Sequence, residues 1–289
     1  MSRRRFLGAL GVTGGGVGLF AALGLKGSLG SPAPRPRVTE GTQRMIEAYG
    51  DRKLQRGEWW LPPNAPAGRL PTVVLVHGGF WGPSYDRSLE DAVAADLSGR
   101  GFLCWNIDYS AADEPWPATL TDVAKGYDHI AVGAYADRVD PKRVAVVGHS
   151  AGGHLALWLA SRRRASGFVP PASVPYPALA VAQAPVAALV DGSRARLGGG
   201  AVDAFVGGTP AQVPDRYRVA DPVALLPTGV PSVLVHGAAD NLVPISQSET
   251  YVAAAGSSSR LARFEGDHFQ HLDPTSEACD LMRAALAVL

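Results

Sequence analysis

The chain has 289 residues, of which 46% are hydrophobic and 18% charged, with 34 glycines, 23 prolines and a net charge of +1. This composition excludes a disordered chain, and the glycines show no fixed period, which excludes a collagen-like protein. Residues 1–33 hold four positive charges and no acid, so the rest of the chain carries −3. A near-neutral, slightly acidic body gives no electrostatic reason to expect nucleic acid as a partner.

The first 33 residues have the pattern of an export signal. Three arginines at positions 3–5 precede Phe6-Leu7 and a weakly apolar stretch of 18 residues, 8–25. A positive region before an apolar one is typical of signal peptides, and paired arginines before Phe-Leu resemble the twin-arginine signal. We therefore expect an exported protein that meets the twin-arginine export machinery and contacts the membrane only through this segment. An uncleaved membrane anchor is the alternative, because 18 residues approach the length of a bilayer span.

Residues 45–289, after a predicted linker at 34–44, alternate apolar runs with helix-length segments. Such alternation predicts an α/β fold with a mostly parallel sheet between helices. The predicted strands are residues 72–77, 102–109, 143–148, 178–183, 232–236 and 261–265. The predicted helices are residues 88–98, 116–136, 152–161 and 277–288. Between residues 185 and 231 the pattern lapses into Gly, Pro and short helical pieces, which predicts a small cap insertion.

The most informative motif is Gly148-His-Ser-Ala-Gly-Gly153, which follows a predicted strand and opens a predicted helix. A G-x-S-x-G sequence in this context predicts a sharp turn that exposes a nucleophilic serine. We therefore predict Ser150 as the nucleophile. The backbone N–H of Ala151, at the start of the helix, is a predicted donor to a developing oxyanion. His149 fills the variable position of the turn.

A second motif, His77-Gly-Gly-Phe-Trp81, ends the first predicted strand. Glycines let the backbone approach a ligand, so we predict Gly79, and next Gly78, as the other oxyanion-hole donors. His77 is expected to brace this loop by hydrogen bonding. Phe80 and Trp81 are candidate walls of the substrate pocket together with Phe269, although Trp81 could equally lie in the core.

Two later segments supply an acid and a base. Asp240 lies just past one predicted strand, and His268 follows the last one. A carboxylate can orient an imidazole and stabilise its protonated form, and the chain order Ser…Asp…His is that of hydrolases with this serine turn. His271 competes with His268 as the base, but His268 is nearer the strand end. Asp267 is interpreted as a turn residue.

Together, the segments HGGFW, GHSAGGHLALWLA, HGAADNLVP and GDHF resemble the α/β-hydrolase superfamily. They are more specifically similar to the branch that includes kynurenine formamidases and carbohydrate or feruloyl esterases, over roughly residues 45–285. The resemblance implies a serine esterase that cleaves carboxylic esters of small or aryl substrates through an acyl-enzyme, with Ser150, Asp240 and His268 as the triad and no cofactor. Ser110 departs from the pattern, because the related sequences usually carry arginine there.

Other interpretations stay open from the sequence. An amide-cleaving hydrolase, either an arylformamidase or a small serine peptidase, would use the same triad, and a non-catalytic binding module would keep the same scaffold. The export signal favours an ester, because formamidases of this branch are usually cytosolic. No metal is predicted, since no histidines show ligand spacing with an acidic partner. Cys104 and Cys279 are interpreted as buried thiols, with one disulfide as the alternative.

Overall fold

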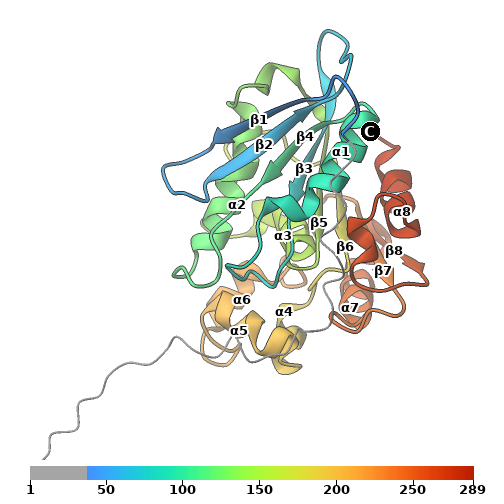
Figure 1. Cartoon of the computed structure of the whole chain (residues 1–289). Coiled ribbons are helices and arrows are strands. Elements are labelled where there is room, and N and C mark those ends of the chain that lie inside the picture. Colours follow the sequence, from blue (N-terminus) through green and yellow to red (C-terminus); the bar gives the residue numbers. More distant parts are fainter. Residues whose placement is uncertain (1–37) are drawn as a thin grey trace, which may run out of the picture. The chain divides into compact units, whose positions relative to one another are not determined.

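The computed structural model describes residues 38–289, so the predicted export signal lies outside the described residues. One eight-stranded sheet runs through this part of the chain in the order β1-β2-β4-β3-β5-β6-β7-β8 (Figure 1). The strands are β1 (Gln43–Ala48), β2 (Arg56–Leu61), β3 (Leu70–Val76), β4 (Leu103–Ile107), β5 (Val139–His149), β6 (Leu179–Gln183), β7 (Ser232–Gly237) and β8 (Ser259–Phe264). β2 is antiparallel to both β1 and β4, and the remaining neighbours are parallel. The prediction of a mostly parallel sheet is confirmed.

Helices cover both faces of the sheet (Figure 1). They are α1 (Asp91–Gly99), α2 (Ala118–Asp128), α3 (Ala151–Ser161), α4 (Leu189–Arg194), α5 (Ala201–Val206), α6 (Pro214–Ala220), α7 (Ser246–Ala255) and α8 (Glu277–Leu286). Successive side chains of a strand point to opposite faces. Val74 and Val76 of β3 accordingly pack in the core of α2 and α3, whereas Val73 and Leu75 pack with α1 and α8.

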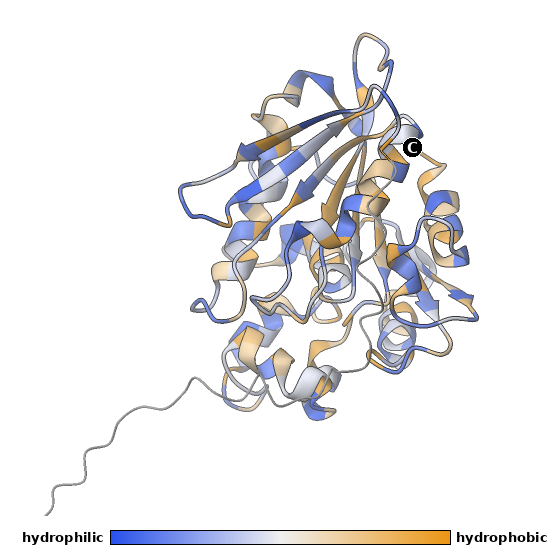
Figure 2. Cartoon of the chain, in the orientation of Figure 1, coloured by the Kyte–Doolittle hydropathy of each residue, from blue (hydrophilic) through white to orange (hydrophobic). Residues whose placement is uncertain are grey.

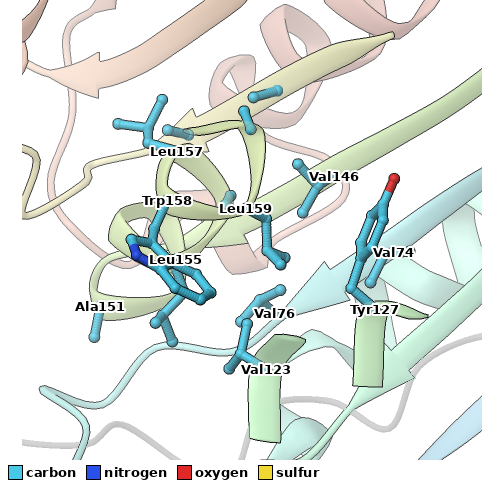
Figure 3. Close-up of a cluster of buried hydrophobic side chains, with 14 of the residues drawn as sticks. Val74, Val76, Val123, Tyr127, Val146, Ala151, Leu155, Leu157, Trp158 and Leu159 are labelled. Atoms are coloured by element: carbon cyan, nitrogen blue, oxygen red, sulfur yellow. The ribbon is translucent and has the colours of Figure 1, made fainter. Parts of the chain in front are cut away.

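The central strands are apolar because both of their faces are buried. Figure 2 shows this hydrophobic centre, and Figure 3 shows how Val74, Val76 and Val146 of the sheet meet Trp158 of α3 and Tyr127 of α2. Burial of such side chains stabilises a fold by about 2 kcal/mol each. The buried sheet therefore provides a rigid support for the side chains on the loops that follow its strands.

Several elements differ from the sequence prediction, among them β1, β2 and α7, which no predicted element covers. β1 and β2 were not predicted, and β1 begins at Gln43, so it includes two residues of the predicted linker. Its polar, exposed sequence lacks the apolar pattern that marks a strand. The helix predicted over 116–136 ends at Asp128 and continues as separate 3₁₀ turns. Gly133 in that stretch disfavours a helix interior by about 1 kcal/mol, and Glu47 contacts the His129 ring at 3.2 Å.

The segment between residues 185 and 231 contains the short helices α4, α5 and α6. Glycines at 198–200 and 207–208 interrupt it with left-handed backbone at every one of these positions. Phe205 of α5 joins the core that contains Trp81.

Cys104 and Cys279 are both buried and unpaired, which confirms the interpretation as thiols. Within residues 38–289, no helix is both long and apolar enough to cross a membrane.

Candidate active site

Ser150 occupies the sharp turn between β5 and α3. Its backbone has φ 59° and ψ −118°, a conformation that non-glycine residues rarely adopt. The flanking glycines make the turn possible. A Cβ on Gly148 would lie 2.1 Å from the carbonyl oxygen of Gly152, and one on Gly152 would lie 2.0 Å from that of Val76. The strained turn is therefore the one that the G-x-S-x-G sequence predicts.

Asp240 and His268 meet at the same edge of the sheet. His268 Nδ1 lies 2.6 Å from Asp240 Oδ2, a short charge-assisted hydrogen bond. The other carboxyl oxygen of Asp240 accepts the backbone N–H groups of Leu242 and Val243, each at 2.9 Å. Burial raises the pKa of Asp240, but the bonds from His236 and His268 outweigh it and hold this pKa well below its usual value. Asp240 is thus ionised and fixes the orientation of the His268 ring.

The loop after β3 lies against the nucleophile. A Cβ on Gly78 would come within 3.1 Å of Ser150 Cβ. Gly79 has φ 112°, and its Cα is covered by the ring of Tyr85, which a Cβ would approach to 2.5 Å. Ala151 is the first residue of α3, where a backbone N–H has no partner within the helix. Gly78 and Ala151 thus both adjoin Ser150.

His77 braces this loop as the sequence predicts. Its Nδ1 donates to the carbonyl of Gly78 at 2.8 Å, and the Tyr109 hydroxyl donates to the His77 carbonyl at 2.7 Å. The rings of His77 and Tyr109 stack with centroids 4.2 Å apart. Burial lowers the pKa of His77, so the ring is neutral at pH 7.

The three predicted pocket residues lie in different environments. Phe269 is 51% exposed, and its ring stands edge-on to His268 at 5.5 Å. Phe80 is half-buried and touches the cap at Gly198. Trp81 is 1% exposed and stacks on Phe205 at 4.5 Å, so it lies in the core, which is the alternative that the sequence left open. Its backbone has a positive φ of 55°.

The alternative base, His271, is less suitable by geometry. It is fully buried, and no group in residues 38–289 bonds its ring nitrogens. Burial, followed by the nearby His268 and His236, lowers its pKa to about 3. Asp267 is exposed and caps its own turn through the Phe269 N–H, as interpreted from the sequence. The geometry therefore favours His268 as the partner of Asp240.

Sequence reasoning missed two residues of this site. Tyr85 packs on Gly79 and remains 38% exposed, at the rim next to the oxyanion loop. His236 is the second histidine on Asp240, with Nε2 at 3.3 Å from Oδ2. The sequence signals neither role, because each depends on how a single loop folds back on itself: Tyr85 lies six residues after Gly79, and His236 lies four residues before Asp240. In the described residues, no three His, Cys, Asp or Glu side chains gather to hold a metal ion.

Residues 59–254 match the model of a family described as BD-FAE. The chain belongs to the BD-FAE family. The match includes the strands that carry Ser150 and Asp240 and ends before His268. Relatives in Mycobacterium tuberculosis are named esterase LipQ, 26% identical over 77% of this chain and 54% of its own length, and esterase LipC, 27% identical over 71% and 53%. This BD-FAE chain thus spans about half the length of the curated relatives it matches.

Solved structures share the fold of this BD-FAE chain. A truncated carbohydrate esterase from gut microbiota superposes with a TM-score of 0.73 at 18% identity, covering 87% of this chain and 98% of its own. Esterase B from Lactobacillus rhamnosis superposes with a TM-score of 0.71 at 19% identity, covering 88% of each chain. The eight-stranded sheet and these superpositions show the α/β-hydrolase fold.

Proposed function

We propose that this chain is a serine hydrolase that cleaves carboxylic esters through an acyl-enzyme. The observation that carries the proposal is the 2.6 Å contact between His268 and Asp240 at the sheet edge that holds the strained Ser150 turn. The relatives named esterases support the same class of reaction. A fixed imidazole at the same sheet edge as a strained serine turn is consistent with the arrangement that activates a hydroxyl for attack on a carbonyl.

Acylation begins when His268 takes the proton of Ser150 through Nε2, since its Nδ1–H is held by Asp240. The Ser150 oxygen attacks the ester carbonyl, and the N–H groups of Gly79 and Ala151 stabilise the resulting oxyanion. Each such donor lowers the barrier by about 3 kcal/mol. The protonated His268 then gives its proton to the departing alcohol. Because Asp240 is ionised, it stabilises the imidazolium that forms between these two steps.

Deacylation repeats the same steps with water as the nucleophile. His268 removes a proton from a water molecule, which attacks the acyl carbonyl, and the same two N–H groups hold the second oxyanion. The proton on His268 returns to the oxygen of Ser150 as the acid leaves. No step needs a group other than the residues named and water.

Small or aryl esters are the substrates that we propose. Phe269, beside His268, and Tyr85, against Gly79, are partly exposed aromatic side chains next to the proposed catalytic groups. The cap helices α4, α5 and α6 have six, six and seven residues, too short for the continuous amphipathic helix of an interfacial lid. A water-soluble substrate then reaches Ser150 without a lid opening.

The proposal is tested with a substrate panel and two serine variants. The panel contains acyl esters, acetylated sugars and aryl formamides. S150A should lower kcat by several orders of magnitude, whereas S173A, which changes an exposed serine, should leave it unchanged. A reactive phosphonate should add its mass to Ser150 and to no other serine. Faster turnover of the formamides than of every ester would favour the amide-cleaving alternative, and an active S150A would refute the mechanism.

The N-terminal segment is proposed as a twin-arginine export signal. Changing Arg3 and Arg4 to lysine keeps the charge but removes the guanidinium pair, so the variant should stay in the cytoplasm. Fractionation of cells that express the wild type and the double variant measures this. Normal export of the variant would refute the twin-arginine assignment.

A further inference from the structure

His149, the variable residue of the serine turn, touches both of the other catalytic loops. Its Nε2 lies 2.9 Å from the backbone carbonyl oxygen of His268, and the two imidazole rings are 4.6 Å apart. On the other side, a Cβ on Gly78 would come within 3.2 Å of His149 Nδ1. One buried ring thus lies between the base loop and the oxyanion loop.

The hydrogen bond fixes the form of this imidazole. A carbonyl oxygen only accepts, so Nε2 carries the proton and Nδ1 keeps its lone pair. Nothing in residues 38–289 bonds this Nδ1. Burial, followed by the neighbouring His268 and His271, lowers the pKa of His149 well below its usual value. The ring therefore stays neutral while His268 alternates between neutral and protonated.

Neutrality matters because His268 becomes an imidazolium during the proposed reaction. A second positive ring at 4.6 Å would oppose that charge. His271 also faces this group, with its ring 5.6 Å from that of His149 and a pKa lowered to about 3 by burial. The remaining groups around His268 are the ionised Asp240 and, behind it, His236, which bonds Asp240 at 3.3 Å. Two neutral rings and one carboxylate thus adjoin the base.

We propose that His149 is a positioning residue that holds the backbone of His268 at the distance where its ring reaches Asp240. This inference rests on the proposed esterase function. Loss of the Nε2–H donor releases the His268 backbone and loosens the 2.6 Å bond from Nδ1 to Asp240. Asp240 then stabilises the imidazolium less, which slows the step in which the imidazolium forms. A displacement of this kind lowers kcat by on the order of tenfold or more, with KM little changed.

Three variants test the role. H149F keeps a ring but removes both nitrogens, and H149Q restores an N–H donor at the reach of Nε2. H154F is the matched control, because His154 is also fully buried and also bonds a backbone carbonyl through Nε2, that of Ala220 at 2.9 Å. It has no contact with His268. The melting temperatures of the three variants show how much each substitution destabilises the fold.

The readouts are the NMR signal of the proton on His268 Nδ1, which reports the bond to Asp240, and the pH profile of kcat/KM. We expect H149F to shift this signal and to lower kcat, H149Q to recover most of both, and H154F to leave the signal unchanged. If H149F does not fold, H149N takes its place, because its amide is one carbon too short to reach the carbonyl. The same Nδ1 proton signal in H149F or H149N, H149Q and H154F would overturn the proposal. The NMR measurement needs no turnover, so it separates this outcome from a failure of the esterase assignment.

Discussion

Replacement of Asp240 by asparagine is the sharpest test of the site, because N–H groups surround both oxygens of the carboxylate. Oδ1 accepts the N–H groups of Leu242 and Val243, and Oδ2 accepts from His268 at 2.6 Å. His236 Nε2, which donates to the carbonyl of Val243 at 2.9 Å, also lies 3.3 Å from Oδ2. An amide has one oxygen and one NH₂ group. In either orientation its NH₂ faces two N–H donors. Asparagine therefore has the same shape as Asp240, but its hydrogen-bonding groups do not match the N–H groups around it.

Two effects follow from D240N. If the amide NH₂ faces His268, the imidazole must turn its lone pair to Nδ1 and its proton to Nε2, which leaves no base for Ser150. In serine proteases the same change of acid to amide lowers kcat by about 10⁴-fold. If the NH₂ instead faces Leu242 and Val243, two buried N–H groups lose their acceptor, at about 1–3 kcal/mol each.

The assay compares D240N with D267N at pH 7. Asp267 lies in the His268 loop, is exposed, and accepts only the N–H of Phe269 at 2.9 Å. Turnover and the free energy of unfolding are measured for both variants. The folded-state pKa of Asp240 is depressed, so its contribution to stability is present above pH 4 and is lost as pH falls further. Turnover of D240N within tenfold of the wild type would refute the assignment of Asp240.

The remaining predictions concern the base, a buried acid and the pocket. H268A should lower kcat by several orders of magnitude and H271A by far less; a milder effect of H268A than of H271A, measured with a 4-nitrophenyl ester, would reverse the assignment. Glu90 is fully buried, no group in residues 38–289 bonds its carboxyl, and burial, with Asp91, raises its pKa to about 8. This raised pKa makes the fold lose stability as pH rises from 4.5 towards 8, so E90Q should raise the melting temperature more at pH 7 than at pH 5. Acetyl to butyryl esters should be turned over faster than long acyl esters, without interfacial activation; a rate maximum at about 12 carbons or more would show a lipase-like tunnel.

Much of the fold was predictable because its central strands are buried on both faces. β3 to β8 are apolar enough to be recognised locally, although their ends moved by up to four residues. β1 and α7 escaped prediction for the opposite reason. β1 is an exposed edge strand, and α7 begins with the polar sequence Ser246-Gln-Ser-Glu-Thr, which has no apolar repeat although Gln247 and Ser248 are buried. Only tertiary pairing determines the structure of such segments.

The site was predictable where a motif specifies its own backbone. Gly148 and Gly152 leave no space for a side chain, so their spacing around Ser150 already describes the turn. The parallel strands then bring Ser150 and the Asp240 loop to one edge, as strand order requires. The contact of His149 was not predictable, because it joins two loops that are far apart in sequence. The contact of His236 lies within four residues of chain, and it was not predictable because it depends on how the loop after β7 turns back.

Strained backbone gathers at the same edge as the candidate catalytic residues. Six non-glycine residues in the described part of the chain have positive φ. Of these, Ser150 and Ala184 follow directly on β5 and β6, and Phe80 and Trp81 lie four and five residues after the end of β3. Such conformations cost about 1–3 kcal/mol each and persist only where the surroundings enforce them. Here the neighbouring strand does so, since Gln183 accepts the Ser150 N–H at 2.7 Å and Val235 accepts that of Ala184 at 2.8 Å. The buried parallel sheet therefore both supports the loops and holds the serine turn in a conformation that the turn would not keep alone.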